Sequence, residues 1–140
     1  MYEIQYSKPS SINSAVAELG KSKDGKLLAG GMTLIPTLKA RLSSPDVLVD
    51  LNGSNLSNIT VTGTEVEIGA MTRHSDVASS SELKNSLPSL AKLAAGIGDH
   101  MVRNWGTRGG PIANNDPAAC YTSAVLALNA KTTTNETTPY

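Results

Sequence analysis

The sequence predicts an α+β fold of two subdomains, with a boundary near residue 55. In the first third of the chain, short apolar runs alternate with segments of helical spacing, which is typical of a small parallel β-α-β-α-β unit. Residues 52–58 are almost all turn-forming, and beyond them the pattern changes to a β-hairpin and then to helices. We therefore expect residues 1–55 to form a parallel subdomain. Residues 56–140 are expected to form a second subdomain of mixed or antiparallel strands and helices.

The first strand and helix are predicted from their periodicity. Two tyrosines and an isoleucine alternate with polar residues over residues 2–6, which indicates a strand with one buried face. Ser11 is suited to cap a helix over residues 12–19, whose apolar residues fall on one helical face. Gly20 suits the end of that helix.

The rest of the first subdomain follows in the same way. Residues 26–29 form a short apolar strand that Gly30-Gly31 ends. The next helix, over residues 34–42, tolerates Pro36 in its first turn. Residues 47–49 are continuously apolar, as expected of a strand that is covered on both faces.

The second subdomain is predicted to begin with a hairpin over residues 59–68. A helix is then expected from Ser86 or Pro88 to residue 97, and another from Asp116-Pro117 to residue 128. Between them, residues 99–115 have no clean periodicity. The tail, residues 131–140, is polar and rich in Thr, so it would pair at a sheet edge or fray.

Composition excludes several classes of protein. Twelve basic and twelve acidic residues give a formal net charge of zero, which argues against non-specific binding to nucleic acid or to an anionic membrane. A single cysteine, Cys120, excludes an internal disulfide and a cysteine-built metal site, and two histidines leave no credible metal-ligand set. No apolar run approaches the length needed to cross a bilayer, and Met1–Ser10 has no secretory signal, so we expect a cytoplasmic protein.

Two glycine-containing turns are the candidate binding elements. In residues 28–34, Gly30 and Gly31 lie between a strand and a helix, where a flexible backbone and the free N–H groups of the helix start favour a phosphate. In residues 103–111, Gly109 and Gly110 lie close to Thr107, and Arg103 and Arg108 could face phosphate oxygens. Two such turns in separate subdomains suit a long ligand such as a dinucleotide. The alternatives are an empty tight turn and a surface loop with solvated arginines.

Other residues have both a functional and a structural interpretation. Asp50 could bind a ribose, although hydrogen bonding within a turn is the more common role. Cys120 lies near a predicted helix start that could lower its pKa, but a small packed residue is more usual. Trp105 could stack on a ring or simply pack. Near His74, Ser75 and Asp76 are interpreted as residues of a helix start.

Six blocks, in order along the chain, carry a resemblance to a known family. They are Leu28-Ala29-Gly30-Gly31-Met32-Thr33-Leu34-Ile35-Pro36, Val49-Asp50-Leu51, Ile68-Gly69-Ala70-Met71-Thr72 with His74, Ile97-Gly98-Asp99, Val102-Arg103-Asn104 with Gly106-Thr107 and Gly109-Gly110, and Asn114-Asn115-Asp116-Pro117-Ala118-Ala119. The chain resembles the FAD-binding (medium) subunit of the molybdenum hydroxylase family, of the carbon monoxide dehydrogenase and xanthine dehydrogenase type. The resemblance covers nearly the whole chain.

The resemblance implies a two-subdomain FAD-binding fold in an oxidoreductase. It implies FAD contacts from Leu28, Ala29, Gly30, Gly31, Met32, Thr33, Leu34, Thr107, Gly109 and Gly110. The flavin would relay electrons from iron–sulfur clusters in one partner subunit to an external acceptor, while a molybdenum-cofactor subunit oxidises the substrate. No catalytic acid, base or nucleophile and no metal ligand is then expected in this chain.

The chain departs from the family pattern in ways that suggest a second hypothesis. Pro111 stands where the family usually has Asn or Ser, Arg108 replaces an apolar residue, and Cys120 replaces a cofactor-binding Asp. The family's flavin subunit also continues well beyond residue 140, so the second subdomain is expected to be incomplete at its C-terminus. The alternative is therefore a truncated, non-catalytic fragment or assembly module that no longer holds FAD. A weaker alternative is a generic nucleotide-phosphate binder that uses only Gly30-Gly31.

Overall fold

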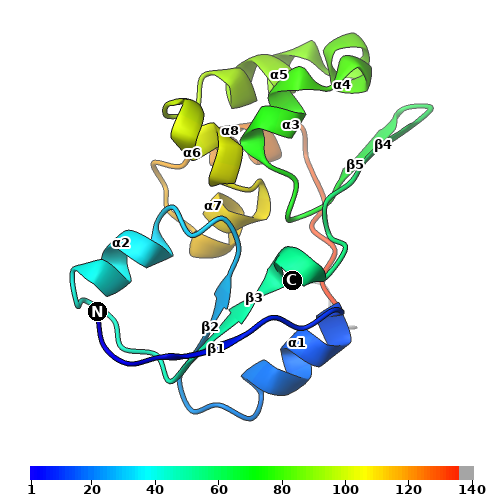
Figure 1. Cartoon of the computed structure of the whole chain (residues 1–140). Helices are drawn as coiled ribbons and strands as arrows, with labels where there is room; N and C mark the ends of the chain where they lie inside the picture. Colours follow the sequence, from blue (N-terminus) through cyan, green and yellow to red (C-terminus); the bar gives the residue numbers. More distant parts are fainter. Residues whose placement is uncertain (136–140) are drawn as a thin grey trace.

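A three-stranded parallel sheet forms the centre of the first lobe in the computed structural model, which describes residues 1–135 (Figure 1). The strands are β1 (Gln5–Ser7), β2 (Gly25–Leu28) and β3 (Val47–Asp50), in the order β1-β3-β2. Helix α1 (Ile12–Leu19) connects β1 to β2, and α2 (Leu34–Lys39) connects β2 to β3. The predicted parallel β-α-β-α-β unit is confirmed.

The central strand carries most of the buried side chains of this sheet. Leu48, Val49 and Asp50 of β3 are all buried, as its continuous apolar run predicts. The prediction of a buried face on the first strand was wrong, because Tyr2 and Tyr6 are 48% and 60% exposed. Strand β1 is an edge strand, and helix α1 packs mainly on β2 and β3, so the side chains of β1 are left largely uncovered.

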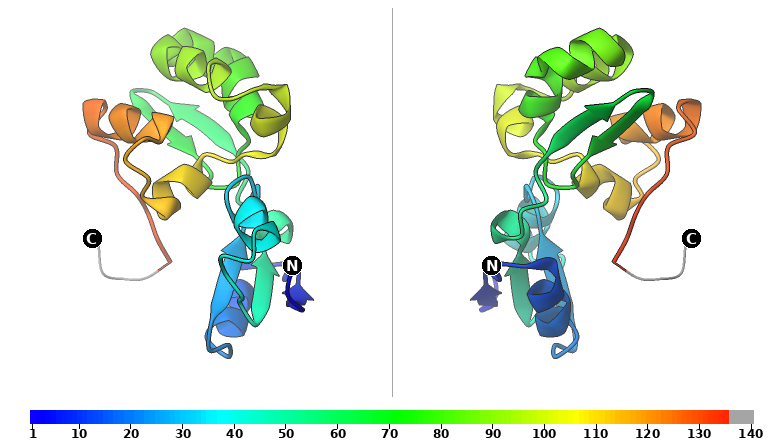
Figure 2. Two further views of the ribbon diagram at one scale, coloured as in Figure 1. Left: turned by 90° about the vertical axis from the view of Figure 1, so that its left-hand side faces the viewer. Right: turned by 90° about the vertical axis from the view of Figure 1, so that its right-hand side faces the viewer.

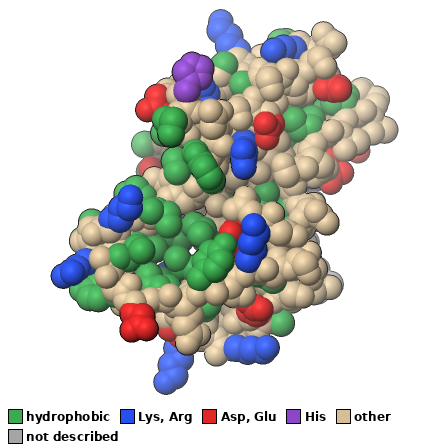
Figure 3. Space-filling model, in the orientation of Figure 1, with side chains coloured by type: hydrophobic (Ala, Val, Ile, Leu, Met, Phe, Trp, Pro, Cys, Tyr) green, Lys and Arg blue, Asp and Glu red, His purple; other side chains and the backbone are tan. Residues whose placement is uncertain are grey.

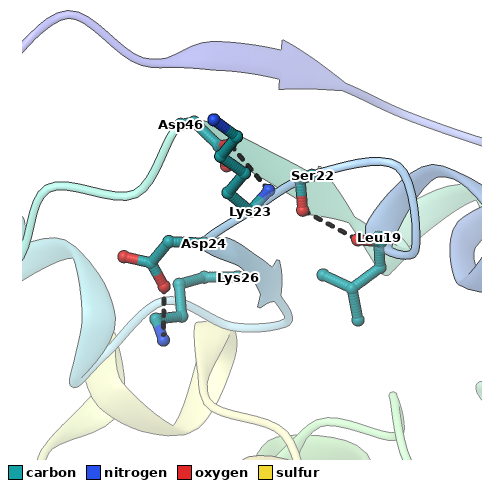
Figure 4. Close-up of polar contacts among 6 residues, drawn as sticks. All are labelled: Leu19, Ser22, Lys23, Asp24, Lys26 and Asp46. Atoms are coloured by element: carbon teal, nitrogen blue, oxygen red, sulfur yellow. Dashed lines mark hydrogen bonds and ion pairs between the residues drawn. The ribbon is translucent and has the colours of Figure 1, made fainter.

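A polar cluster closes the amino ends of β2 and β3 (Figure 4). The backbone N–H of Lys23 donates to Asp46 Oδ2 at 3.0 Å, and Lys26 Nζ pairs with Asp24 Oδ1 at 3.0 Å. The Ser22 hydroxyl donates to the Leu19 carbonyl at 2.7 Å and ends α1. Because the strands are parallel, their carboxyl ends lie together at the opposite edge, beside the glycine pair.

The second lobe begins with an antiparallel hairpin. After a short 3₁₀ helix, η1 (Leu51–Gly53), strands β4 (Ile59–Thr62) and β5 (Glu65–Ile68) pair antiparallel with Thr62 opposite Glu65. Gly63 has φ of +59° in the tight turn between the two strands. In both views of Figure 2 the hairpin lies between two groups of helices from the same lobe.

Within residues 1–135, six short helices complete the second lobe. They are α3 (His74–Ser79), α4 (Ser81–Ser86), α5 (Pro88–Ala95), α6 (His100–Trp105), α7 (Gly109–Asn114) and α8 (Cys120–Ala127). The core contains buried side chains from β5, α3, α4, α5 and α8, namely Ile68, Val77, Leu83, Leu90, Ala91, Ala94 and Tyr121.

Several helix boundaries differ from those predicted. Ser86 ends α4 rather than opening a helix, and α5 starts at Pro88. Helices α6 and α7 lie within residues 99–115, where no helix was predicted. The glycines of this segment interrupt the apolar spacing from which a helix would be recognised. Helix α8 starts at Cys120, because Asp116 instead caps a preceding turn by accepting a hydrogen bond from the Ala118 N–H at 2.9 Å.

The described chain ends in coil, and none of residues 131–135 forms a strand or helix. The expectation that the tail pairs or frays therefore falls partly on residues 136–140, which lie outside the described residues. Within residues 1–135, no helix is both long enough and apolar enough to pass through a bilayer.

Candidate functional site

The first turn, residues 28–34, joins β2 to α2 at the carboxyl edge of the sheet. Gly31 has φ of +73°, a conformation that favours glycine. Among the described residues, the backbone N–H groups of Gly30, Gly31, Met32 and Thr33 have no hydrogen-bond partner. Four successive free donors in a turn form a favourable environment for an anion.

The second turn, residues 103–111, runs from the end of α6 into the first turn of α7. It pairs antiparallel with residues 70–74, and Arg73 lies opposite Thr107. Three backbone hydrogen bonds hold this pairing: His74 N–H to Gly106 O at 3.0 Å, Arg108 N–H to Thr72 O at 2.8 Å, and Gly109 N–H to Ala70 O at 2.8 Å. The turn is therefore braced from one side by a segment more than 30 residues earlier in the sequence.

The bracing corrects the expectation of an open, donor-rich second turn. Gly109 and Gly110 begin helix α7 rather than forming a loop, and the Gly109 N–H already has a partner. A Cβ on Gly109 would lie 2.8 Å from Ala70 Cβ, so glycine is needed there for close backbone packing. The group of this turn that remains available is the Thr107 hydroxyl, which is buried and has no hydrogen-bond partner among the described residues.

The two turns meet directly. A Cβ on Gly30 would overlap the carbonyl oxygen of Trp105 and lie 2.8 Å from Gly106 Cα. Figure 1 shows the loop between β2 and α2 reaching the second lobe beside α6 and α7. The expectation that the two turns lie together rather than apart is confirmed.

The two arginines of the second turn do not behave as predicted. Arg103 Nη1 donates to the carbonyls of Ile97 and Gly98 at 2.9 and 3.2 Å. Arg108 Nη1 donates to the Ile68 carbonyl at 3.0 Å, and burial lowers the pKa of this guanidinium. Both side chains therefore bind the protein's own backbone, where each fixes a loop.

Behind the second turn lies a buried aromatic pair. The His74 and Tyr121 rings stack with centroids 5.4 Å apart and an interplanar angle of 29°. Burial lowers the pKa of His74 and raises that of Tyr121 to about 12, so both groups are neutral near pH 7. The sequence placed His74 in one of the six family blocks and beside a predicted helix start at Ser75 and Asp76, but it gave His74 no role of its own. Residues 70–74 were not predicted to brace the turn, because a long-range backbone pairing leaves no local pattern.

Asp50 has the structural role that its position at a strand end suggests. Its Oδ1 accepts hydrogen bonds from the Asn52 N–H at 2.9 Å and from Asn52 Nδ2 at 2.6 Å, and its Oδ2 accepts one from the Tyr6 hydroxyl at 2.5 Å. Burial raises the pKa of this carboxyl, but the hydrogen bonds from Tyr6 and Asn52 outweigh burial and hold it below its usual value. The carboxylate is thus already occupied by the turn that follows β3.

Trp105 and Cys120 are both surface residues. The Trp105 indole is 55% exposed, and the Arg73 guanidinium lies 5.6 Å from its ring centroid. Cys120 is exposed at the start of α8. In Figure 3, apolar side chains gather around α2 and the neighbouring sheet. Exposed apolar residues of that part of the chain include Leu27, Met32 and Leu42.

A cavity of about 350 Å³ lies on the segment that links the lobes and does not include any of the predicted cofactor residues. Its lining residues are Leu51, Asn52, Asn55, Leu56, Ser57, Met71, Arg73 and Asp76. Within residues 1–135, no group of three or more His, Cys, Asp or Glu could hold a metal ion.

Comparison with known proteins decides the family. Residues 2–138 match the family described as the FAD binding domain in molybdopterin dehydrogenase. The chain belongs to this family. The resemblance inferred from the sequence is confirmed, and with it FAD as the cofactor that the family binds.

Individual relatives agree with this assignment. The chain is 42% identical over 129 residues to the carbon monoxide dehydrogenase medium chain of Hydrogenophaga pseudoflava, covering 91% of this chain and 45% of the relative. It is 40% identical to the glyceraldehyde dehydrogenase medium chain of Sulfolobus acidocaldarius, covering 91% and 46%. The chain thus spans about half the length of the curated relatives it matches.

Solved structures confirm the α+β FAD-domain fold. Carbon monoxide dehydrogenase from Hydrogenophaga pseudoflava aligns with a TM-score of 0.80 at 45% identity, covering 83% of this chain and 41% of the other. Quinoline 2-oxidoreductase from Pseudomonas putida 86 aligns with a TM-score of 0.81 at 32% identity, covering 84% and 42%.

Proposed function

We propose that this chain is the FAD-holding part of an electron-transfer subunit in a molybdenum-containing hydroxylase or dehydrogenase complex. The observation that carries the proposal is the direct contact between Gly30 and the second turn, beside four unpartnered backbone donors. A diphosphate-bridged ligand needs backbone donors that it can approach closely, and glycines permit that approach. Residues 1–55 and 56–140 would be the two subdomains that meet at these turns.

The residues present fit FAD. The first turn offers a cradle in which the four N–H groups can bind the diphosphate. Thr107 contributes a buried hydroxyl that lacks a partner among the described residues, and such groups in proteins normally find one. Leu28, Ala29, Gly30, Gly31, Met32, Thr33 and Leu34 would hold one stretch of the ligand, and Thr107, Gly109 and Gly110 the other.

The chain's own contribution to the reaction is binding and orientation. When bound, FAD would supply the redox chemistry, because a flavin can exchange electrons either one or two at a time. The first turn binds negative charge without a lysine, and the Thr107 hydroxyl donates from the opposite side. The partly exposed Met32 and Trp105 side chains lie beside these turns, where they would exclude water from the bound ligand.

The proposed electron path passes through two partner subunits. An iron–sulfur subunit would deliver electrons to the flavin, a molybdenum-cofactor subunit would oxidise the substrate, and an external acceptor would receive the electrons in the cytoplasm. The support is that the relatives are named as medium chains of dehydrogenases, one of which is a Cu,Mo carbon monoxide dehydrogenase in its solved form.

A second candidate function is an assembly module that does not hold FAD alone. It is favoured by the second turn, where the Gly109 N–H donates to Ala70 and Pro111 has no N–H to offer. The module would keep the fold and the partner contacts of the family without the cofactor.

A flavin titration with one glycine variant separates the two candidates. If the chain holds FAD as proposed, the purified full chain will quench FAD fluorescence with a stoichiometry of one. The departures from the family pattern predict instead that the isolated chain binds FAD weakly or not at all, which would give little or no quenching. Gly30→Ala should weaken FAD binding by about tenfold or more, because the added methyl group overlaps the Trp105 carbonyl and pushes the turns apart.

Gly20→Ala is the matched control, since its Cβ would make only ordinary contacts at the end of α1 and its φ is −66°. Absence of flavin binding by the unsubstituted chain would favour the assembly module. Comparable affinity for ADP and FAD would instead favour a generic nucleotide binder that uses Gly30-Gly31.

A further inference from the structure

His74 lies directly behind the second turn. The residue is buried, its backbone N–H donates to the Gly106 carbonyl, and its ring fills the space beside the Gly106 Cα. A Cβ on Gly106 would lie 2.7 Å from His74 Nε2 and 2.8 Å from Cδ2. The imidazole therefore leaves no room for a side chain at position 106.

Tyr121 packs against the imidazole from the core of the second lobe. Tyr121 is 1% exposed and belongs to the core of the second lobe, and its ring stacks on His74. A continuous series of contacts thus runs from Tyr121 through His74 and Gly106 to Gly30 of the first lobe. Because the interiors of proteins are close-packed, a displacement of the imidazole would shift Gly106 and with it the contact with Gly30.

The polar atoms of this pair indicate a role beyond filling space. His74 Nδ1 and the Tyr121 hydroxyl are both buried and have no hydrogen-bond partner within residues 1–135. An aliphatic pair of similar size would fill the same volume without burying polar atoms, whose burial costs free energy. Proteins retain buried polar atoms without partners mainly at positions where the local geometry serves a binding site.

We propose that His74 is a positioning residue whose ring, supported by Tyr121, holds Gly106 and Thr107 against Gly30 and so fixes the spacing of the two turns that grip FAD. The inference rests on the proposed function, since the spacing matters only if one ligand spans both turns. His74 does not itself contact the ligand in this account. Its effect passes through the backbone of the second turn.

The test compares His74→Ala with a core variant that does not touch the turn. Leu83→Ala removes a fully buried side chain from α4 in the same lobe and serves as the matched control for lost stability. FAD affinity is measured on the full chain at a temperature at which circular dichroism shows both variants folded. His74→Ala should weaken FAD binding about tenfold or more, whereas Leu83→Ala should stay within about twofold of the unsubstituted chain.

A conservative variant distinguishes positioning from the chemistry of the imidazole. His74→Phe keeps a ring stacked on Tyr121 and beside Gly106, so it should recover most of the affinity that His74→Ala loses. Unchanged FAD affinity in His74→Ala, or an equal loss in Leu83→Ala, would overturn the inference.

A ligand-free measurement keeps the inference testable if the chain binds no flavin. The amides of Arg108 and Gly109 donate to the carbonyls of Thr72 and Ala70, so their hydrogen exchange reports the bracing of the turn. His74→Ala should speed exchange at these two amides by more than Leu83→Ala does. Absence of FAD binding by the unsubstituted chain refutes the proposed function, whereas equal exchange in the two variants refutes the role of His74.

Discussion

At the scale of single residues, glycine and histidine determine how the two lobes meet. Gly30 allows the first turn to touch the backbone of Trp105 and Gly106, and His74 fills the space on the far side of Gly106. The glycine pair could be identified from the sequence, because a Gly-Gly between a strand and a helix is a local pattern. The role of His74 could not, because it depends on residues 106 and 121, which are distant in the chain.

The buried His74 predicts a pH dependence of stability. Its pKa is lowered by burial, so between that value and about 6.5 the unfolded chain binds a proton that the folded chain does not. Stability is therefore unaffected by this group above about pH 6.5 and falls as the pH decreases below it, by at most about 1.4 kcal/mol per pH unit.

Urea unfolding of the unsubstituted chain and of His74→Phe from about pH 7.5 to about pH 5.5 measures this effect. The variant lacks the titrating group and should lose less stability on acidification. Parallel stability curves for the two proteins would contradict the prediction.

At the scale of elements, strands and helices with regular apolar spacing could be predicted from the sequence, whereas most of the short helices that lack such spacing could not. The parallel strands and the hairpin have clear apolar spacing, and they were predicted. Helices α3, α4, α6 and α7 have only six residues each, and only the start of α3, at Ser75 and Asp76, was predicted. Side-chain caps start two of these helices: in α4 the Ser80 hydroxyl accepts a hydrogen bond from the Leu83 N–H at 3.2 Å, and in α6 the Asp99 carboxylate caps the first turn.

Helix α6 provides the test at this scale. The Asp99 carboxylate accepts a hydrogen bond from the Val102 N–H at 2.9 Å and caps the helix that leads into the second turn. Asp99→Ala should lower the free energy of unfolding by about 1 kcal/mol, as for other N-cap removals. Asp99→Asn retains a capping oxygen and should recover most of that loss in the same urea titration. If Asp99→Asn lowers the free energy of unfolding as much as Asp99→Ala does, the stabilisation comes from the negative charge and not from the capping hydrogen bond.

At the scale of the whole molecule, the account depends on two lobes that share one ligand. The lobes touch where the first and second turns meet, and the relatives that share this fold include solved carbon monoxide dehydrogenases. The family and its cofactor could be inferred from six ordered sequence blocks, because each block lies at a turn or at a strand end that shapes the site. The bracing of the second turn could not, because it arises only when residues 70–74 and 106–109 pair in space.

The most direct measurement is a two-dimensional amide NMR titration of the isotope-labelled full chain with FAD. The account predicts that the backbone resonances of Gly30, Gly31, Met32 and Thr33 shift together with that of Thr107, along a single binding curve. Shifts confined to the first turn, or shifts at neither turn, would contradict the claim that one ligand is gripped from both lobes.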